Sequence, residues 1–215
     1  MYFFKTPEII KWYYPSLVWN GPRDEKSIFL TFDDGPVAGV TGNILQTLAK
    51  FNVKATFFCV GENIDRNPGL FRQVFQEGHM IGNHTFHHLN GWQHTGEDYI
   101  QDIRKCAAVI EGNGFSPGIK LFRPPYGKIR KSAIQRIIKE YQIIMWDVLT
   151  YDFSGLSREK LLRQSKRHTT GGSIIVFHDS LKTRSNTEFL ISQFIDHFIS
   201  LDYNFCTLDR LFLLN

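Results

Sequence analysis

Two aspartates and a pair of histidines are the residues of this chain best suited to bind a metal ion. Asp33 and Asp34 stand side by side where an apolar stretch meets a Gly-Pro turn. Carboxylates this close raise each other's pKa unless a cation intervenes. His84 and His88 are four residues apart, so one helical turn would bring both imidazoles to the same side. With Asp34 they predict a site of two histidines and one carboxylate that leaves positions open for water and substrate.

These residues also have ordinary structural interpretations. Asp33 and Asp34 could belong to a solvated turn or a helix cap, and a single histidine is more often structural than ligating. His87, the third histidine of the cluster, would point away from the other two. We therefore assign His87 to packing or to support of the site, and only the spaced pair to metal binding.

The segment Arg123-Pro124-Pro125-Tyr126 offers groups that could hold charge during a reaction. Two successive prolines stiffen the backbone and remove two donors, so the next available N–H belongs to Tyr126. That N–H could stabilise an oxyanion, and Arg123 could pair with one of the two aspartates. The alternative is a stiff turn that carries a surface arginine.

Asp152 and His178 each follow a hydrophobic stretch and complete the set of polar clusters. A histidine with a carboxylate partner can be held protonated, which is the form that a general acid needs. In the structural alternative, Asp152 caps a helix and His178 has a backbone partner at a strand end.

All five clusters begin at or just beyond the end of a predicted strand, where α/β folds collect their catalytic groups. Short apolar runs rich in β-branched and aromatic residues alternate with amphipathic segments from near residue 27 onward. Strands are predicted over 27–32, 55–60, 79–82, 120–122, 142–146, 173–177 and 204–208. Helices are predicted over 40–51, 70–77, 97–112, 130–140, 158–168 and 188–200. About seven strand–helix units fit either a barrel or a doubly wound sheet.

Length and composition indicate one compact domain. With 215 residues, 42% of them hydrophobic and 21% charged, the chain can bury a substantial core. We expect residues 27–215 to form this domain and residues 1–26 to pack over one end of it as an irregular aromatic cover. The aromatic residues concerned are Trp12, Tyr13, Tyr14 and Trp19.

Charge, cysteine usage and hydropathy exclude several classes of protein. The formal net charge is +4 and the basic residues are scattered, so no nucleic-acid surface is expected. The cysteines Cys59, Cys106 and Cys206 are unpatterned and fit buried hydrophobic positions better than disulfides or a metal cluster. No stretch has the length of a membrane span or the form of an export signal. This favours a cytoplasmic protein, or an extracytoplasmic one if a signal has been trimmed from the sequence.

On these residues the chain resembles the NodB-homology polysaccharide deacetylases, carbohydrate esterase family 4. The five clusters match the five motifs of this family in order between about residues 28 and 178, which is far more specific than any one motif. The resemblance implies an α/β fold, a distorted (β/α) barrel of about seven strands. It also implies a divalent metal, zinc in the first place, with cobalt or another divalent ion as the alternative.

The resemblance further implies a role for each polar residue. Asp34, His84 and His88 match the metal ligands, Asp33 matches the catalytic base, and Arg123 matches the arginine that orients this base.

On the acid side of the expected site, His178 matches the general acid and Asp152 the carboxylate that tunes it. The backbone N–H of Tyr126 matches the oxyanion donor.

Three positions depart from the pattern of the family, and the departures concern the substrate groove. Leu149 stands in place of an aspartate, Phe153 in place of a tryptophan, and Val176 in place of the leucine that lines the acetyl pocket. All three keep an apolar or aromatic wall, so the chemistry should survive, and the changes bear on the shape of the groove and on the sugar. The residues assigned to substrate binding are Pro124, Tyr126, Phe153 and Val176.

The expected function is metal-dependent removal of acetyl groups from an N-acetylglucosamine-containing glycan, such as chitin oligosaccharide or peptidoglycan, with release of acetate. The expected partner is this glycan, and no sequence feature specifies an oligomeric state. Alternatives are hydrolysis of another linear or cyclic amide, or of O-acetyl xylan. A non-catalytic glycan-binding module is disfavoured, because it has no need for base, acid and metal ligands together.

Overall fold

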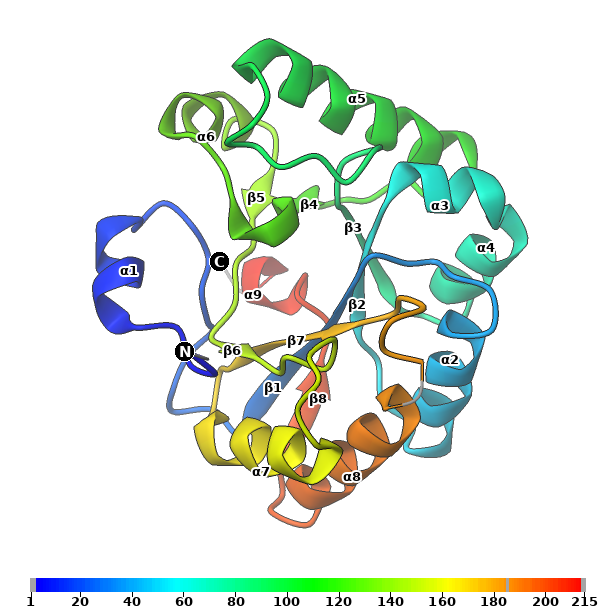
Figure 1. Cartoon of the computed structure of the whole chain (residues 1–215), viewed down its shortest axis with the longest axis vertical. Coiled ribbons are helices and arrows are strands. Elements are labelled where there is room, and N and C mark those ends of the chain that lie inside the picture. The colour runs from blue at the N-terminus through cyan, green and yellow to red at the C-terminus, as the bar shows by residue number, and fades with distance from the viewer. Residues whose placement is uncertain (1–2, 185, 214–215) are drawn as a thin grey trace.

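The computed structural model describes residues 3–184 and 186–213, which form a curled parallel sheet surrounded by helices (Figure 1). Seven of the described strands follow one path in the order β5-β4-β3-β2-β1-β7-β6, and β8 pairs in parallel with the start of β1. The strands are β1 Ser27–Asp33, β2 Thr56–Cys59, β3 Met80–Asn83, β4 Leu121–Phe122, β5 Gln142–Ile143, β6 Val148–Leu149, β7 Ile174–His178 and β8 Asn204–Cys206. The prediction of a distorted barrel of about seven strands is confirmed.

Most helices lie between successive strands and cover the outside of the sheet (Figure 1). They are α1 Glu8–Tyr13, α2 Thr41–Lys50, α3 Gly61–Arg66, α4 Pro68–Gln76, α5 Gly96–Gly112, α6 Lys131–Ile137, α7 Arg158–His168, α8 Thr187–Ile199 and α9 Arg210–Leu213, with a 3₁₀ turn η1 Pro125–Gly127. The start of α7 illustrates how the sequence sets a boundary. The Ser157 hydroxyl accepts a hydrogen bond from the Lys160 N–H, which satisfies a donor that the first helical turn leaves unpaired.

Side-chain alternation along β1 separates the core from the site. All seven residues of β1 are buried, and successive side chains point to opposite faces of a strand. Leu30 and Phe32 therefore pack under the surrounding helices in the largest hydrophobic cluster. Thr31 and Asp33 face the inside of the curl. Because Asp33 is in register with His178 of β7, the two polar side chains meet at the carboxyl ends of their strands.

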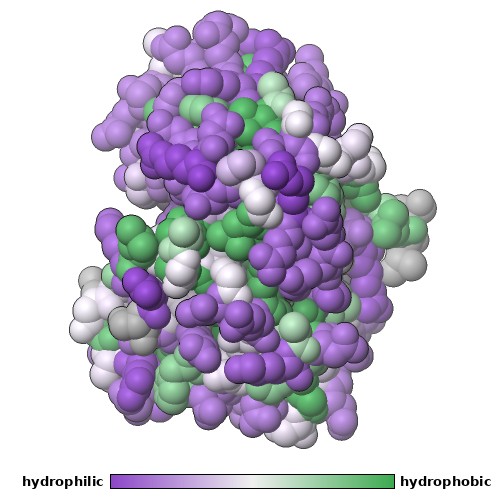
Figure 2. Space-filling model, turned by 90° about the vertical axis from the view of Figure 1, so that its right-hand side faces the viewer, coloured by the Kyte–Doolittle hydropathy of each residue, from purple (hydrophilic) through white to green (hydrophobic). Residues whose placement is uncertain are grey.

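The surface formed by α2, α3 and α4 is mostly hydrophilic. The helices α2, α3 and α4 lie on the right in Figure 1, and Figure 2 shows this side with mostly hydrophilic side chains and scattered apolar ones. In α2 the side chains of Ile44, Leu45 and Leu48 are buried under this surface. Among the described residues, no helix is long and apolar enough to cross a lipid bilayer.

The N-terminal segment differs from the irregular aromatic cover that the sequence predicts. It contains the helix α1, and Trp12 on that helix is 80% exposed, whereas Trp19 is buried. The segment also makes strand-like bridges: Val18 pairs with Ile144, and Asn20 pairs with Ser173. Residues near the N-terminus thus extend the sheet beside β5 and β7.

Several short elements were not predicted from the sequence. The strand β6 has two residues and the helices α1 and α3 have six each, which is too short for a periodic pattern to emerge. The predicted strand over 142–146 is shorter in the structure, because β5 ends at Ile143. The prediction for α7 agrees at both ends.

Candidate active site

Asp34, His84 and His88 converge at the carboxyl ends of β1 and β3. Their donor atoms all lie within 4.8 Å of one another. Asp34 Oδ1 is 3.2 Å from His88 Nε2 and 3.8 Å from His84 Nε2. The expected helical turn between the histidines is wrong, since Thr85 and His88 have φ values of 62° and 55° and the segment is an irregular loop. The imidazoles are therefore brought together by backbone in the left-handed region and not by helical spacing.

The hydrogen bonds of these histidines suit them to bind a metal. His84 Nδ1 lies 2.8 Å from the Arg123 carbonyl oxygen, so this nitrogen carries the proton and Nε2 keeps its lone pair towards Asp34. Burial lowers the pKa of His84 to about 4, which keeps the imidazole neutral. His88 Nδ1 lies 3.1 Å from the Tyr126 hydroxyl. Two imidazole nitrogens and one carboxylate oxygen form a possible site for a divalent metal.

The charge on Asp34 is favoured by its surroundings. Burial opposes ionisation of this carboxyl group. The hydrogen bond with His88 and the electrostatic interactions with His178, His84 and His88 nevertheless lower its pKa below the usual value. Asp34 is therefore an anion next to two imidazole nitrogens, as a metal ligand must be.

The loop that carries the two histidines is held by Asp102, which the analysis of the sequence missed. Asp102 lies on α5, and its Oδ2 accepts hydrogen bonds from the backbone N–H groups of Phe86 and His87 at 2.9 Å and 3.0 Å. Its Oδ1 is 2.5 Å from the His87 ring. His87 thus points away from Asp34 and towards α5. No signal in the sequence connects Asp102 to this loop, because the residue lies inside a regular helix.

Arg123 is completely buried and holds Asp33. Its Nη1 lies 2.7 Å from Asp33 Oδ1, and its Nη2 and Nε donate to the carbonyl oxygens of Met145 and Ile144 at 2.9 Å and 3.3 Å. The alternative of a surface arginine is therefore wrong. Burial lowers the pKa of Arg123, and Asp33 counteracts this by stabilising the charge. The pair fixes one oxygen of Asp33 at the end of β1.

His178 is held by Asp152 through two hydrogen bonds. His178 Nδ1 lies 2.7 Å from Asp152 Oδ1, and the His178 N–H donates to Oδ2 at 2.7 Å. Burial opposes protonation of the imidazole, but Asp152, Asp34 and Asp33 together raise the pKa of His178 to about 9. The imidazole is therefore protonated at neutral pH. The suggestion that Asp152 caps a helix does not hold, because Ser157 caps α7.

The residues assigned to substrate binding surround these groups. Tyr126 has a φ of 60° in η1, and its N–H donates to no acceptor among the described residues. Its side chain is 61% exposed, whereas Pro124 is buried. The Phe153 ring is 44% exposed and stands perpendicular to the His178 ring at 4.9 Å. Val176 is buried two residues before His178 and shares its face of β7.

A second supporting carboxylate, Asp179, fixes the turn after Asp34. Asp179 Oδ1 accepts the Gly35 N–H at 2.7 Å, and Oδ2 accepts the Thr41 hydroxyl at 2.7 Å. Burial raises the pKa of Asp179 to about 8. A Cβ atom at Gly35 would come within 1.8 Å of Asp179 Oδ2, so this position requires glycine. The sequence places Asp179 beside His178 but gives no sign of its contact with Gly35.

The comparisons with known proteins agree with this geometry. The family profile described as polysaccharide deacetylase matches residues 20–144. The chain is 36% identical over 209 residues to the peptidoglycan-N-acetylglucosamine deacetylase PgdA of Listeria monocytogenes, which covers 97% of this chain and 41% of that protein. It is 33% identical over 199 residues to a peptidoglycan-N-acetylglucosamine deacetylase of Bacillus cereus, with 91% and 92% covered. The chain thus spans about two fifths of the length of the Listeria protein.

A solved structure gives the same result for the fold. The crystal structure of the Bc1960 peptidoglycan N-acetylglucosamine deacetylase superposes with a TM-score of 0.89, 30% identity and 96% of each chain covered. The profile spans β1 to β5, and therefore the residues Asp33, Asp34, His84, His88 and Arg123. This chain therefore belongs to the polysaccharide deacetylases, the NodB-like carbohydrate esterase family 4.

Proposed function

We propose that this chain removes the acetyl group from N-acetylglucosamine units of a glycan such as peptidoglycan or chitin oligosaccharide and releases acetate. The observation that carries the proposal is the convergence of three elements at one end of the barrel. These are a possible metal site, an arginine-held carboxylate and a histidine held protonated by a carboxylate. Two similar proteins are described as peptidoglycan-N-acetylglucosamine deacetylases, which supports this choice of substrate.

Asp34, His84 and His88 would hold the metal, for which we propose zinc. The donor set fits zinc, which accepts imidazole nitrogen and carboxylate oxygen, and only three protein ligands would leave further positions open. A divalent ion in such a site supplies Lewis-acid chemistry, because it polarises a carbonyl oxygen and lowers the pKa of water.

Asp33 and His178 would handle the two protons of the reaction. We assign Asp33 as the base that accepts a proton from the attacking water, with Arg123 holding its Oδ1. The water oxygen forms a bond to the amide carbon, and the C–N bond then breaks. His178, whose pKa of about 9 keeps it charged at neutral pH, donates its proton to the departing amine. The products are acetate and the free amino sugar.

The remaining groups would hold the acetyl amide in place. The Tyr126 N–H, which has no acceptor among the described residues, would donate to the oxygen on which negative charge develops. Val176 would contact the acetyl methyl group from the inner face of β7, with Phe153 and Pro124 as further walls. An exposed aromatic ring beside the acid, such as Phe153, also suits contact with a sugar ring.

Acetate release from a panel of acetylated glycans tests the proposal. Purified protein would be stripped of metal by a chelator, reloaded with zinc, and incubated with peptidoglycan, chitin oligosaccharides and O-acetyl xylan. We expect acetate from at least one N-acetylated glycan, only after reloading. Release from O-acetyl xylan alone would favour the esterase alternative. Binding of the glycans without acetate release in any sample would favour a non-catalytic module.

A further inference from the structure

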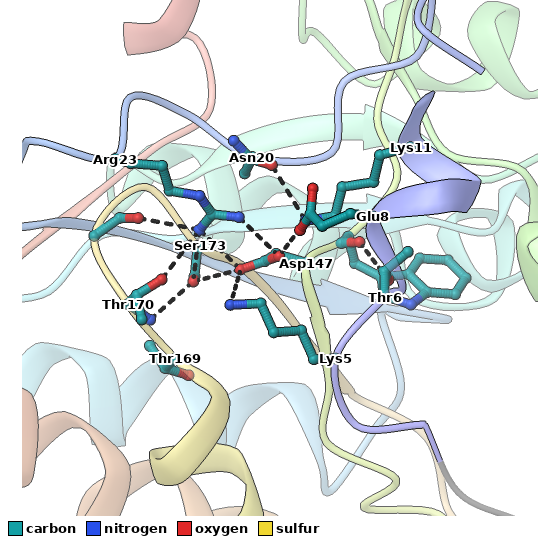
Figure 3. A network of polar contacts seen from close by, with 12 residues as sticks. Lys5, Thr6, Glu8, Lys11, Asn20, Arg23, Asp147, Thr169, Thr170 and Ser173 are labelled. Carbon is teal, nitrogen blue, oxygen red and sulfur yellow. Dashed lines mark hydrogen bonds and ion pairs between the residues drawn. The ribbon is translucent and has the colours of Figure 1, made fainter. Parts of the chain in front are cut away.

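A buried carboxylate outside the active site ties the N-terminal segment to the barrel (Figure 3). Asp147 lies between β5 and β6 and is completely buried. Its Oδ1 is 2.6 Å from Lys11 Nζ and 2.9 Å from Arg23 Nη2, and its Oδ2 is 2.9 Å from Arg23 Nη1. The Ser173 hydroxyl donates to Oδ2 at 2.7 Å, and Lys5 lies 3.9 Å away. One aspartate thus binds cations from three separate points of the N-terminal segment.

The contacts of Arg23 extend to the turn that precedes β7. Besides Asp147, Arg23 Nη1 contacts the Gly171 carbonyl and the hydroxyls of Thr170 and Ser173, at 3.1 to 3.3 Å. Arg23 is therefore fixed against the turn that leads into β7. We use the name Asp147 cluster for Lys11, Arg23 and Asp147.

On one side of the Asp147 cluster, the N-terminal segment supports the residues that hold Arg123. The Val18 N–H donates to the Ile143 carbonyl at 2.9 Å, and the Val18 carbonyl accepts from the Met145 N–H at 2.7 Å. The carbonyl oxygen of Ile144 lies between these bonds and that of Met145 directly after them, and both accept hydrogen bonds from Arg123. Any shift of this stretch would move the guanidinium group that holds Asp33.

On the other side, the segment supports the residue that holds His178. The Leu149 N–H donates to the Phe4 carbonyl at 2.9 Å. The Tyr151 hydroxyl lies 3.2 Å from the Phe3 nitrogen and 3.3 Å from its carbonyl oxygen. Tyr151 has a φ of 57° and directly precedes Asp152, so its anchoring sets where the Asp152 carboxylate lies.

We propose that the Asp147 cluster is a positioning device for both proton-transfer residues of the proposed reaction. The cluster holds the N-terminal segment against residues 143–151. At one end, residues 143–151 position Arg123 against Asp33. At the other end they position Asp152 against His178. The proposal rests on the proposed function for its kinetic readout. Its spectroscopic readout, the pKa of His178, does not depend on catalysis.

The test uses Arg23→Gln, with Arg136→Gln as the matched control. Arg136 is also an arginine in an ion pair, with Glu97 at 3.0 Å, but both partners are exposed and neither touches the cluster. The pKa of His178 would be measured by NMR in metal-free protein, with its signal assigned from His178→Gln. We expect Arg23→Gln to lower this pKa by about one unit towards the ordinary value of about 6.5. We also expect kcat to fall by up to about 10²-fold with KM little changed, because a small misplacement of catalytic groups suffices.

Two further variants keep the result decisive. Arg23→Lys retains the charge without the planar fork that grips both oxygens of Asp147, so it should restore part of the loss. Tyr151→Phe removes only the hydroxyl that contacts Phe3. This variant would replace Arg23→Gln in the pKa measurement if Arg23→Gln does not fold. It should lower the pKa of His178 in the same direction by a smaller amount.

The outcomes separate a positioning role from a merely structural one. If the folded variants have a lower Tm but keep the wild-type pKa of His178 and the wild-type kcat, the proposal is overturned. An equal change in Arg136→Gln would also overturn it. If the wild type releases no acetate from any glycan, the proposed function fails, and the pKa of His178 still decides the positioning role.

Discussion

The metal-binding residues and the residues that support proton transfer are built in opposite ways. Asp34 and His88 keep 27% and 28% of their side chains exposed, whereas His84 is buried, and the donor atoms of all three lie close together. Arg123 and Asp152, which hold Asp33 and His178, are fully buried and bonded within the protein. Open donors are free to accept an ion, whereas buried partners fix the position and protonation of the groups they hold. Variants of the two regions should therefore fail in different ways.

Loss of a metal ligand should have the largest effect. We expect His84→Ala to lose bound zinc and acetate release together, because it removes one of three protein ligands. Zinc would be counted by mass spectrometry after dialysis. The matched control is His87→Ala, on the same loop but bonded to Asp102, which should keep both properties. Full zinc occupancy in His84→Ala would contradict the assignment.

Loss of the proposed acid should come next and leave the metal in place. We expect His178→Ala to lower kcat by roughly 10²- to 10⁴-fold, the usual effect of removing a general acid. The zinc content should equal that of the wild type, because the imidazole of His178 is held by Asp152 and is not one of the three clustered donors. Unchanged turnover would place the acid elsewhere.

Loss of the partner of the acid should shift the pH profile. The pKa of His178 is raised to about 9, so the protonated form prevails below that pH and is lost as the pH rises through it. Asp152→Asn removes the negative charge, lowers the pKa of His178 and should move the basic limb of kcat to lower pH. The acidic limb should stay, since Asp33 is held by Arg123. A basic limb at the wild-type position would exclude Asp152 from this role.

The smallest effect should follow from the hydroxyl of Tyr126. Tyr126→Phe removes the partner of His88 Nδ1, while the corresponding partner of His84 is a backbone carbonyl that no side-chain change removes. Partners of metal ligands typically contribute about 10- to 100-fold in metal affinity. The Tyr126 side chain is exposed, so water can replace it, and we expect at most the lower value. Competition with a zinc-binding dye would measure it, and a loss as large as that of His84→Ala would contradict the proposed ligand set.

The strand ends were predictable from the sequence because each combines two local signals. Apolar runs such as 27–32 and 173–177 end in polar residues within one or two positions, and parallel strands collect their carboxyl ends at one edge. This rule places Asp33 and His178 at the same edge of the sheet, whereas their direct register follows from the pairing of β1 with β7 in the structure. The resemblance to the family then supplied the expected roles.

The supporting residues were not predictable, because their contacts are long-range or depend on unusual backbone. Asp147 binds Arg23 across 124 positions, and Asp102 reaches a loop from inside a helix. The four-residue spacing of His84 and His88 suggested a helical turn between them. The positive φ of Thr85, which is incompatible with that turn, has no signal in the local sequence. Such residues emerge only when the elements are placed in space.

The two neighbouring aspartates allow the most direct test of how metal binding and proton transfer are divided. Zinc content and acetate release would be measured side by side for the wild type, Asp33→Asn and Asp34→Asn on an N-acetylated chitin oligosaccharide. We expect Asp33→Asn to bind zinc as the wild type does and to release almost no acetate, because it lacks only the proton acceptor. Asp34→Asn should bind zinc weakly. Normal acetate release by Asp33→Asn, or full zinc occupancy in Asp34→Asn, would contradict the division of roles proposed for this site.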